Sequence, residues 1–134
     1  MVFGIQLDSP VPIYEQIVAQ VTYAIASGAL EPGAMIPSVR ELAQQLLVNP
    51  NTVAKAFQEL EQRGVVAAKR GRGMEVTPEA PTACRSQRQA IVRGHIRQAL
   101  REAGSSALPE DEIRQLVEEE LARVNGQRRS REKR

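Results

Sequence analysis

The sequence has 134 residues, which gives room for one ordinary domain or for a small domain with an appendage. Hydrophobic residues make up 42% of the chain and aromatic residues only 3%, so we expect an aliphatic core. A single cysteine, Cys84, excludes an internal disulfide framework and a multi-cysteine zinc site. No apolar run reaches the length of a membrane span. These bounds predict a cytoplasmic protein without a metal or another cofactor.

The charge is small overall and unevenly distributed. The formal net charge is +2; residues 1–78 hold six Lys/Arg against seven Asp/Glu, and residues 79–134 hold twelve against nine. A nucleic-acid partner would therefore have to be bound by well-placed cations rather than by bulk charge. No nucleophile–base–acid set, phosphate loop or group of converging metal ligands is apparent, and His95 stands alone. The sequence does not predict an enzyme.

One amphipathic helix is predicted near the start of the chain. Ile5–Leu7 are compatible with a short strand, and Pro12 is well placed to open a helix. Gly28 suits the C-terminal cap of that helix, a turn follows at Glu31–Gly33, and Met35–Ile36 could form a brief strand. The apolar stripe that predicts the helix consists of Ile13, Ile17, Val21, Ala24 and Ile25.

Two short helices joined by a tight turn are predicted next. Ser38 and Glu41 have the S-x-x-E spacing of a capping box, so the first helix should begin at Ser38. Asn49 can cap the second helix, and Pro50 fits its first position, where no N–H donor is needed. Gly64 suits a left-handed cap at the end of that helix. Helices joined this closely must cross steeply, which is a helix-turn-helix arrangement.

A β-hairpin with a basic tip is predicted after this pair. Strand-like runs at 65–68 and 74–77 flank the turn Lys69–Gly73, which holds three cations. Three helices followed by such a hairpin define a winged helix-turn-helix, a mainly α fold with a small β-wing. The helix-turn-helix would span about residues 38–63 and the wing residues 65–77.

Two longer helices are predicted after a boundary at Pro78. The first runs from about Thr82 to Ala103, and the second starts after Pro109 with an acidic first turn that complements the helix dipole. One small domain cannot bury both apolar stripes, so we expect residues 79–126 to form a two-helix dimerisation hairpin. Residues 127–134 are polar and basic, and we expect a disordered tail there. The dimerisation stripe includes Ile91, Ile96, Leu100, Ile113, Leu116, Val117 and Leu121.

Charged residues on the two tail helices complement one another. Arg93, Arg97 and Arg101 recur on the first helix, and Glu118–Glu120 lie on the second. We expect ion pairs between the helices, within or across protomers. Exposed pairs contribute only about 0–1 kcal/mol each, so the apolar stripes should carry most of the dimerisation.

The sequence resembles the GntR family of transcriptional regulators, and its size resembles the short YtrA-type branch. The resemblance rests on PIYEQI at 12–17, SGALEPG at 27–33, IPSVRELA at 36–43, VNPNTV at 48–53, FQELE at 57–61 and RGRG at 70–73. It implies a winged DNA-binding domain over about residues 10–78, a homodimer, a palindromic operator and repression of transcription. For the short branch it also implies dimerisation through the helical pair, often beside transporter genes.

Candidate DNA contacts follow from the resemblance and from the residue types. Arg40 matches the family's arginine on the second helix, where a guanidinium can bind guanine or phosphate; alternatively it pairs with Glu41 or Glu15. The next helix starts with short hydrogen-bonding groups, and the wing tip combines cations with a glycine that permits close approach to DNA. The candidates are Ser38, Arg40, Asn49, Asn51, Thr52, Lys55, Lys69, Arg70, Gly71 and Arg72, of which Ser38 and Asn49 have caps as their main role.

Two functions remain open at this point. The first is a dimeric, sequence-specific DNA-binding regulator, most simply a repressor of transporter genes. The second is a winged-helix protein-interaction module without specific DNA binding, which the near-neutral winged domain favours. Regulation could act through a small-molecule effector at the junction near Pro78, through a partner protein, or through abundance alone.

Overall fold

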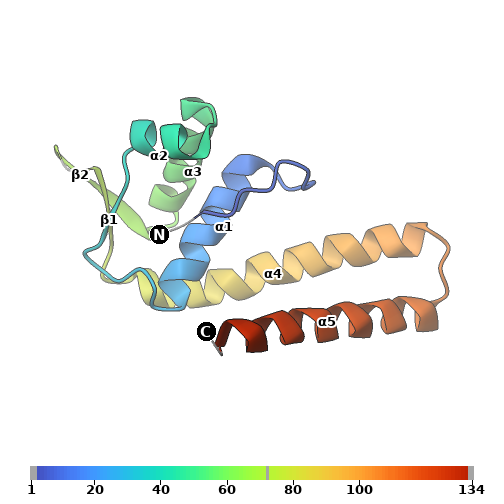
Figure 1. Cartoon of the computed structure of the whole chain (residues 1–134). Helices are drawn as coiled ribbons and strands as arrows, with labels where there is room; N and C mark the ends of the chain where they lie inside the picture. Colours follow the sequence, from blue (N-terminus) through green and yellow to red (C-terminus); the bar gives the residue numbers. More distant parts are fainter. Residues whose placement is uncertain (1–2, 72, 133–134) are drawn as a thin grey trace. The chain divides into compact units, whose positions relative to one another are not determined.

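The computed structural model describes residues 3–71 and 73–132 and confirms the predicted fold class, mainly α with a small β-wing (Figure 1). The chain divides into two compact units, Met1–Val92 and Arg93–Arg134, which we call the winged unit and the hairpin unit. The elements are α1 (Ile13–Ala26), β1 (Met35–Ile36), α2 (Val39–Leu46), α3 (Pro50–Gln62), β2 (Val66–Lys69), β3 (Gly73–Val76), α4 (Ala80–Ser105) and α5 (Glu110–Glu132).

The winged unit has the aliphatic core that the composition predicted. Its helices bury the apolar stripes of α1, α2 and α3 against one another, and Phe57 adds one aromatic side chain that is 5% exposed. The buried hydroxyl of Thr22 donates a hydrogen bond to the carbonyl of Val18 at 2.7 Å, so it costs little to bury. Fully buried large side chains include Ile17, Ile25, Leu42, Leu60 and Val53.

Short-range signals in the sequence set the ends of α2 and α3. The Oγ atom of Ser38 accepts the amide hydrogen of Glu41 at 3.1 Å, which caps α2. Asn49 Oδ1 accepts the amide hydrogen of Asn51 at 2.8 Å, and Pro50 begins α3. Gly64 follows α3 with φ +76°, the left-handed conformation predicted for it. The caps that the sequence predicted are confirmed.

The turn between α2 and α3 contains a left-handed residue other than glycine. Leu47 has φ 56° and ψ 45° and leaves 91% of its surface exposed. The amide of Val48 donates to the carbonyl of Ala43 at 3.1 Å and closes the turn. The two helices are therefore joined as tightly as the helix-turn-helix prediction required.

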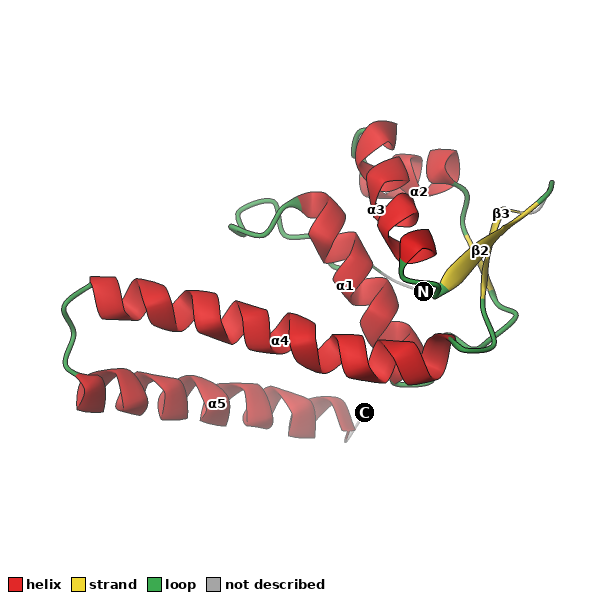
Figure 2. Cartoon of the chain, turned by 180° about the vertical axis from the view of Figure 1, so that it is seen from behind, coloured by secondary structure: helices red, strands yellow, loops and turns green. Residues whose placement is uncertain are grey.

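The wing belongs to a three-stranded antiparallel sheet with strand order β1-β3-β2. Val66 pairs with Val76, and both side chains are buried, so one face of the hairpin packs on the core. Seen in Figure 2, β2 and β3 form an arm that projects beyond the helices of this unit. The predicted hairpin is confirmed, and Arg70 and Gly71, the described residues of its tip, are exposed.

The predicted strand at Ile5–Leu7 is wrong. Glutamine side chains from α1 hold this segment instead: Gln20 exchanges hydrogen bonds of 2.8 and 2.9 Å with the backbone of Gly4. Gln16 does the same with Gln6, at 2.8 and 2.9 Å, and also donates to the carbonyl of Val11. The backbone of Gly4 and Gln6 is satisfied by glutamine side chains one helical turn apart on α1, so no neighbouring strand is required.

The start of the predicted dimerisation hairpin, residues 79–126, differs from the prediction. α4 begins at Ala80, and both Ala80 and Cys84 are fully buried in the core of the winged unit. The structure therefore divides the chain at Val92, whereas the sequence placed the boundary at Pro78. Residues 79–92 were predicted to belong to the dimerisation hairpin, whereas Ala80 and Cys84 pack in the core of the winged unit.

The C-terminal segment, residues 127–134, also differs from the prediction where the structure describes it. α5 continues past Gly126 to Glu132, so the expectation of a disordered tail is wrong for residues 127–132. Gln and Arg are good helix formers, and Arg129 and Arg131 in the last turn complement the helix dipole. No helix within residues 3–71 and 73–132 combines the length and apolarity needed to cross a membrane.

Candidate nucleic-acid interface

The second helix of the helix-turn-helix, α3, has a polar outer face. Val53, Ala56, Phe57 and Leu60 bury the inner face, so with 100° per residue the opposite face carries Asn51, Lys55, Gln58 and Gln62, all exposed. These four side chains are neutral or basic, which suits contact with a polyanion. Sequence reasoning missed Gln58, whose amide can bind adenine bidentately; its spacing from Asn51 and Lys55 was the signal that could have found it.

Arg40 lies exposed on α2, close to the Ser38 cap. The neighbouring Glu41 carboxylate accepts a hydrogen bond from the Ser38 hydroxyl at 3.1 Å. Among the described residues, the ion pairs do not include Arg40, so the alternative in which Glu41 or Glu15 neutralises it finds no support. The guanidinium is available to a ligand.

Lys55 is held by an aromatic ring from α1. Its Nζ atom lies 3.9 Å from the centroid of Tyr14, a cation–π contact. The Tyr14 hydroxyl donates to Glu15 at 3.1 Å, and this hydrogen bond raises the pKa of Tyr14 above its usual value. The contact with Tyr14 therefore holds the ammonium group of Lys55 beside the N-terminal end of α1.

The wing tip presents part of the predicted basic cluster. Arg70 and Gly71 are exposed, and Gly71 has φ +77°, which a residue with a Cβ atom would adopt only with strain. Lys69 does not lie in the turn but ends β2, where its Nζ atom is 3.6 Å from a carboxylate oxygen of Glu75. Arg72, also predicted here, lies outside the described residues.

The two residues that stood out only by being unique, Cys84 and His95, lie in different environments. Cys84 is buried, and burial raises the pKa of its thiol. His95 is exposed on α4. Across residues 3–71 and 73–132, no three His, Cys, Asp or Glu side chains converge as metal ligands.

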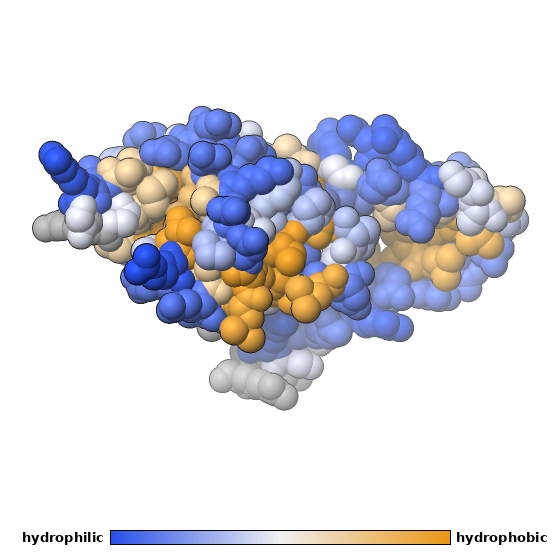
Figure 3. Space-filling view, turned by 90° about the horizontal axis from the view of Figure 1, so that it is seen from above, coloured by the Kyte–Doolittle hydropathy of each residue, from blue (hydrophilic) through white to orange (hydrophobic). Residues whose placement is uncertain are grey.

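The hairpin unit exposes an apolar groove between α4 and α5, of about 400 Å³. Six of the seven residues predicted for dimerisation line it: Ile96, Leu100, Ile113, Leu116, Val117 and Leu121. The seventh, Ile91, belongs to the winged unit and is partly exposed. At the right of Figure 3, hydrophobic side chains of this unit lie exposed among hydrophilic ones.

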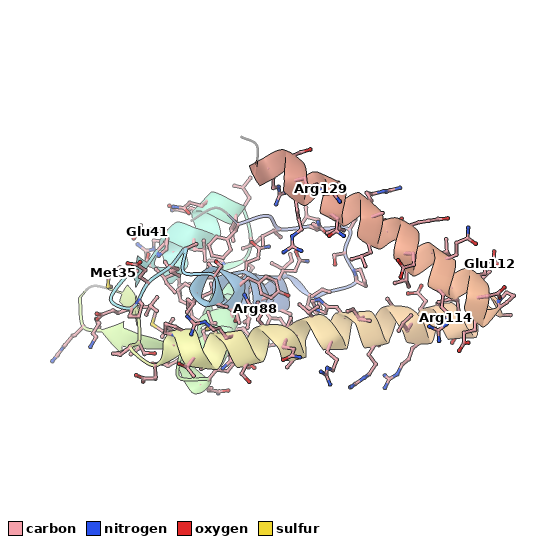
Figure 4. All side chains as sticks on the ribbon, turned by 90° about the horizontal axis from the view of Figure 1, so that it is seen from below. Met35, Glu41, Arg88, Glu112, Arg114 and Arg129 are labelled. Carbon is pink, nitrogen blue, oxygen red and sulfur yellow. The ribbon has the colours of Figure 1, made fainter. Side chains whose placement is uncertain are left out.

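Ion pairs in the hairpin unit run along α5 rather than between the helices. Arg114 pairs with Glu110, and Arg123 with Glu120, each at 3.7 Å. The described ion pairs do not link Arg93, Arg97 or Arg101 to Glu118–Glu120, so of the two predicted alternatives, pairing within one protomer finds no support and pairing across protomers stays a prediction. Charge is separated along α5, with Glu112 near its start and Arg129 near its end (Figure 4).

Comparisons with known proteins agree with this geometry. The model of the family "Bacterial regulatory proteins, gntR family" matches residues 13–76. The HTH-type transcriptional repressor YtrA of Bacillus subtilis (strain 168) is 36% identical over 124 residues, which cover 91% of this chain and 95% of YtrA.

Two solved structures extend the comparison. YtrA from Sulfolobus acidocaldarius, a GntR-family transcription factor, aligns with a TM-score of 0.57 and 37% identity over 75% of this chain and 98% of that one. AraR(DBD) in complex with operator ORX1 aligns with a TM-score of 0.51 and 27% identity over 57% of this chain and 99% of that one.

The winged helix-turn-helix and its similarity to these regulators assign the chain to the DNA-binding transcriptional regulators, a class that is not enzymatic. The match to the family model and the similarity to YtrA show, more specifically, that the chain belongs to the GntR family. The resemblance inferred from the sequence motifs is thereby confirmed, including its link to YtrA-type regulators.

Proposed function

We propose that this regulator is a homodimeric repressor that binds a palindromic operator. α3 enters the major groove, α2 adds Arg40, and the wing contacts the flanking backbone. The contacting residues would be Ser38, Arg40, Asn49, Asn51, Thr52, Lys55, Lys69, Arg70, Gly71 and Arg72. The genes controlled would include transporter genes, as the YtrA-type resemblance implies.

The observation that carries the DNA-binding part is the exposed outer face of α3. Asn51 and Lys55 project from its first turns, opposite the buried face. Such side chains hydrogen-bond base edges and phosphates, whereas Ser38 and Asn49 already serve as caps and can offer backbone amides. Base contacts would therefore fall mainly to Arg40 and the α3 face, and the wing would position the protein.

The uncovered apolar surface of the hairpin unit supports the homodimer. Leu100, Leu116 and Leu121 are 45%, 45% and 51% exposed. A soluble monomer rarely exposes several such side chains together, and a second copy would cover them with a matching surface. The arginines of α4 and the glutamates of α5 would then be able to pair across protomers.

A protein-interaction module that does not use DNA is the competing function. The nearly balanced charge of residues 1–78 favours it. Salt dependence separates the two functions, because binding through several phosphates weakens steeply as salt increases. Regulation by a small-molecule effector is compatible with either function.

Selection of bound sequences from a random duplex pool with the purified full chain tests the proposal. We expect enrichment of an inverted repeat whose half-sites lie about one helical turn apart or slightly more. An enriched single half-site would contradict the symmetric dimer while leaving DNA binding intact. Absence of enrichment at both low and moderate salt would contradict specific DNA binding and favour the interaction module.

A further inference from the structure

The outer face of the wing carries one cation and one carboxylate side by side. In the hairpin, Ala67 pairs with Glu75 and Lys69 with Gly73, so these four residues share one face. Val66 and Val76 lie on the other face, which packs on the core. Lys69 and Glu75 are therefore diagonal neighbours on the surface that turns away from the core.

The contact between these two side chains is partly exposed. Lys69 Nζ lies 3.6 Å from a carboxylate oxygen of Glu75, and the side chains are 51% and 30% exposed. Diagonal cross-strand positions are within reach of long side chains, so the register itself brings the charges together. The pair lies at the end of β2, directly before Arg70 and Gly71 at the tip.

We infer that Glu75 limits the affinity of the wing for DNA by holding Lys69. This inference rests on the proposed binding of the wing to operator DNA. To bind a phosphate, Lys69 must give up its contact with Glu75, or must approach the phosphate with the carboxylate beside it. In both cases the negative charge of Glu75 opposes binding, because it competes with or repels the phosphate.

Removing the charge of Glu75 should therefore strengthen binding, which is opposite to the result expected from damage to the wing. Glu75→Gln keeps the size of the side chain and its position in β3. We expect the affinity for the selected operator to rise about two- to five-fold, in line with an exposed ion pair. Lys69 then becomes available for one more phosphate, so the slope of log K against log[salt] should steepen by up to about 0.9.

A double-mutant cycle assigns the effect to this pair. Lys69→Gln should weaken binding more in the Glu75→Gln background than in the wild type, because only there is Lys69 released. Asp8→Asn provides a matched control, since it makes the same change in net charge in the exposed turn before α1. That turn and the wing lie on opposite sides of the winged unit (Figure 1).

The measurement is fluorescence anisotropy with labelled operator at several salt concentrations, with a thermal melt of each variant. Tighter binding and a steeper slope for Glu75→Gln, with Asp8→Asn unchanged, support the inference. Binding by Glu75→Gln that equals the Asp8→Asn control, or that is weaker than wild type, overturns it while leaving the proposed function standing. A wild-type chain that binds no operator overturns both.

Discussion

The two units of this chain bury their apolar residues to very different degrees. In the winged unit, Ile17, Leu42 and Leu60 are completely buried. In the hairpin unit no described residue between 93 and 131 is fully buried, and Ile96 is 55% exposed. Burial of apolar area is the main favourable contribution to folding, so one unit completes its own core, and the other leaves apolar surface exposed that the proposed second copy would cover. The proposed DNA contacts and the proposed dimerisation surface therefore lie in different parts of the sequence.

Of the proposed substitutions, one that creates a cavity in the core of the winged unit should change stability the most. Leu60→Ala removes a fully buried side chain from α3 and is expected to lower the free energy of unfolding by about 2–5 kcal/mol. Urea denaturation followed by circular dichroism measures this loss. Gln62→Ala, on the exposed face of the same helix, is the control and should change stability by less than about 0.5 kcal/mol. Equal losses in the two variants would contradict a self-contained core.

A charged side chain introduced into the apolar groove of the hairpin unit should weaken dimerisation. Leu116→Glu is expected to weaken the dimer by up to about 1.5–3 kcal/mol per substituted side chain, because it removes a leucine whose exposed surface the second copy would cover. Sedimentation equilibrium measures the dissociation constant. Gln115→Glu adds the same charge to the neighbouring, exposed position of α5 and should leave the dimer intact. If the wild-type protein sediments as a monomer at micromolar concentration, the exposed apolar surface of the hairpin unit is not a dimer interface.

Removal of the α2 guanidinium should affect DNA binding without affecting the core. Arg40→Ala is expected to weaken operator binding by about 1–3 kcal/mol and to relax base preference at the position it contacts. Competition binding with operator variants measures both effects. Gln44→Ala, one turn further along the exposed face of α2, is the control. Operator binding that is unchanged by Arg40→Ala would remove this residue from the interface.

The parts of the fold that could be predicted from the sequence depend on neighbours in the chain. Caps at Ser38 and Asn49, the stripe of α3 and the hairpin all rest on residues a few positions apart. The missed features depend on contacts between distant segments. Gln20 binds the backbone of Gly4 across 16 residues, and spacing along the sequence carries no sign of such a contact.

For the candidate site, the sequence predicted which residues lie there better than it predicted what their side chains contact. Lys55 was expected on the face of α3, but its contact with Tyr14 depends on how α1 and α3 pack. Lys69 was counted among the cations of the tip, yet the strand register places it beside Glu75. Ala80 and Cys84 were assigned to the dimerisation hairpin because the boundary was placed at Pro78, and neighbouring residues give no sign that the start of α4 packs in the core of the winged unit.

The left-handed turn residue Leu47 has a consequence for engineering a more heat-resistant form of this regulator. A left-handed conformation costs an ordinary residue about 1–2 kcal/mol, and an exposed leucine recovers little of this by burial. Glycine or asparagine would tolerate the same backbone conformation at a lower cost. Leu47→Gly or Leu47→Asn is therefore a route to higher thermal stability at one surface position beside α3, the helix proposed to contact DNA, and no core side chain would have to be repacked.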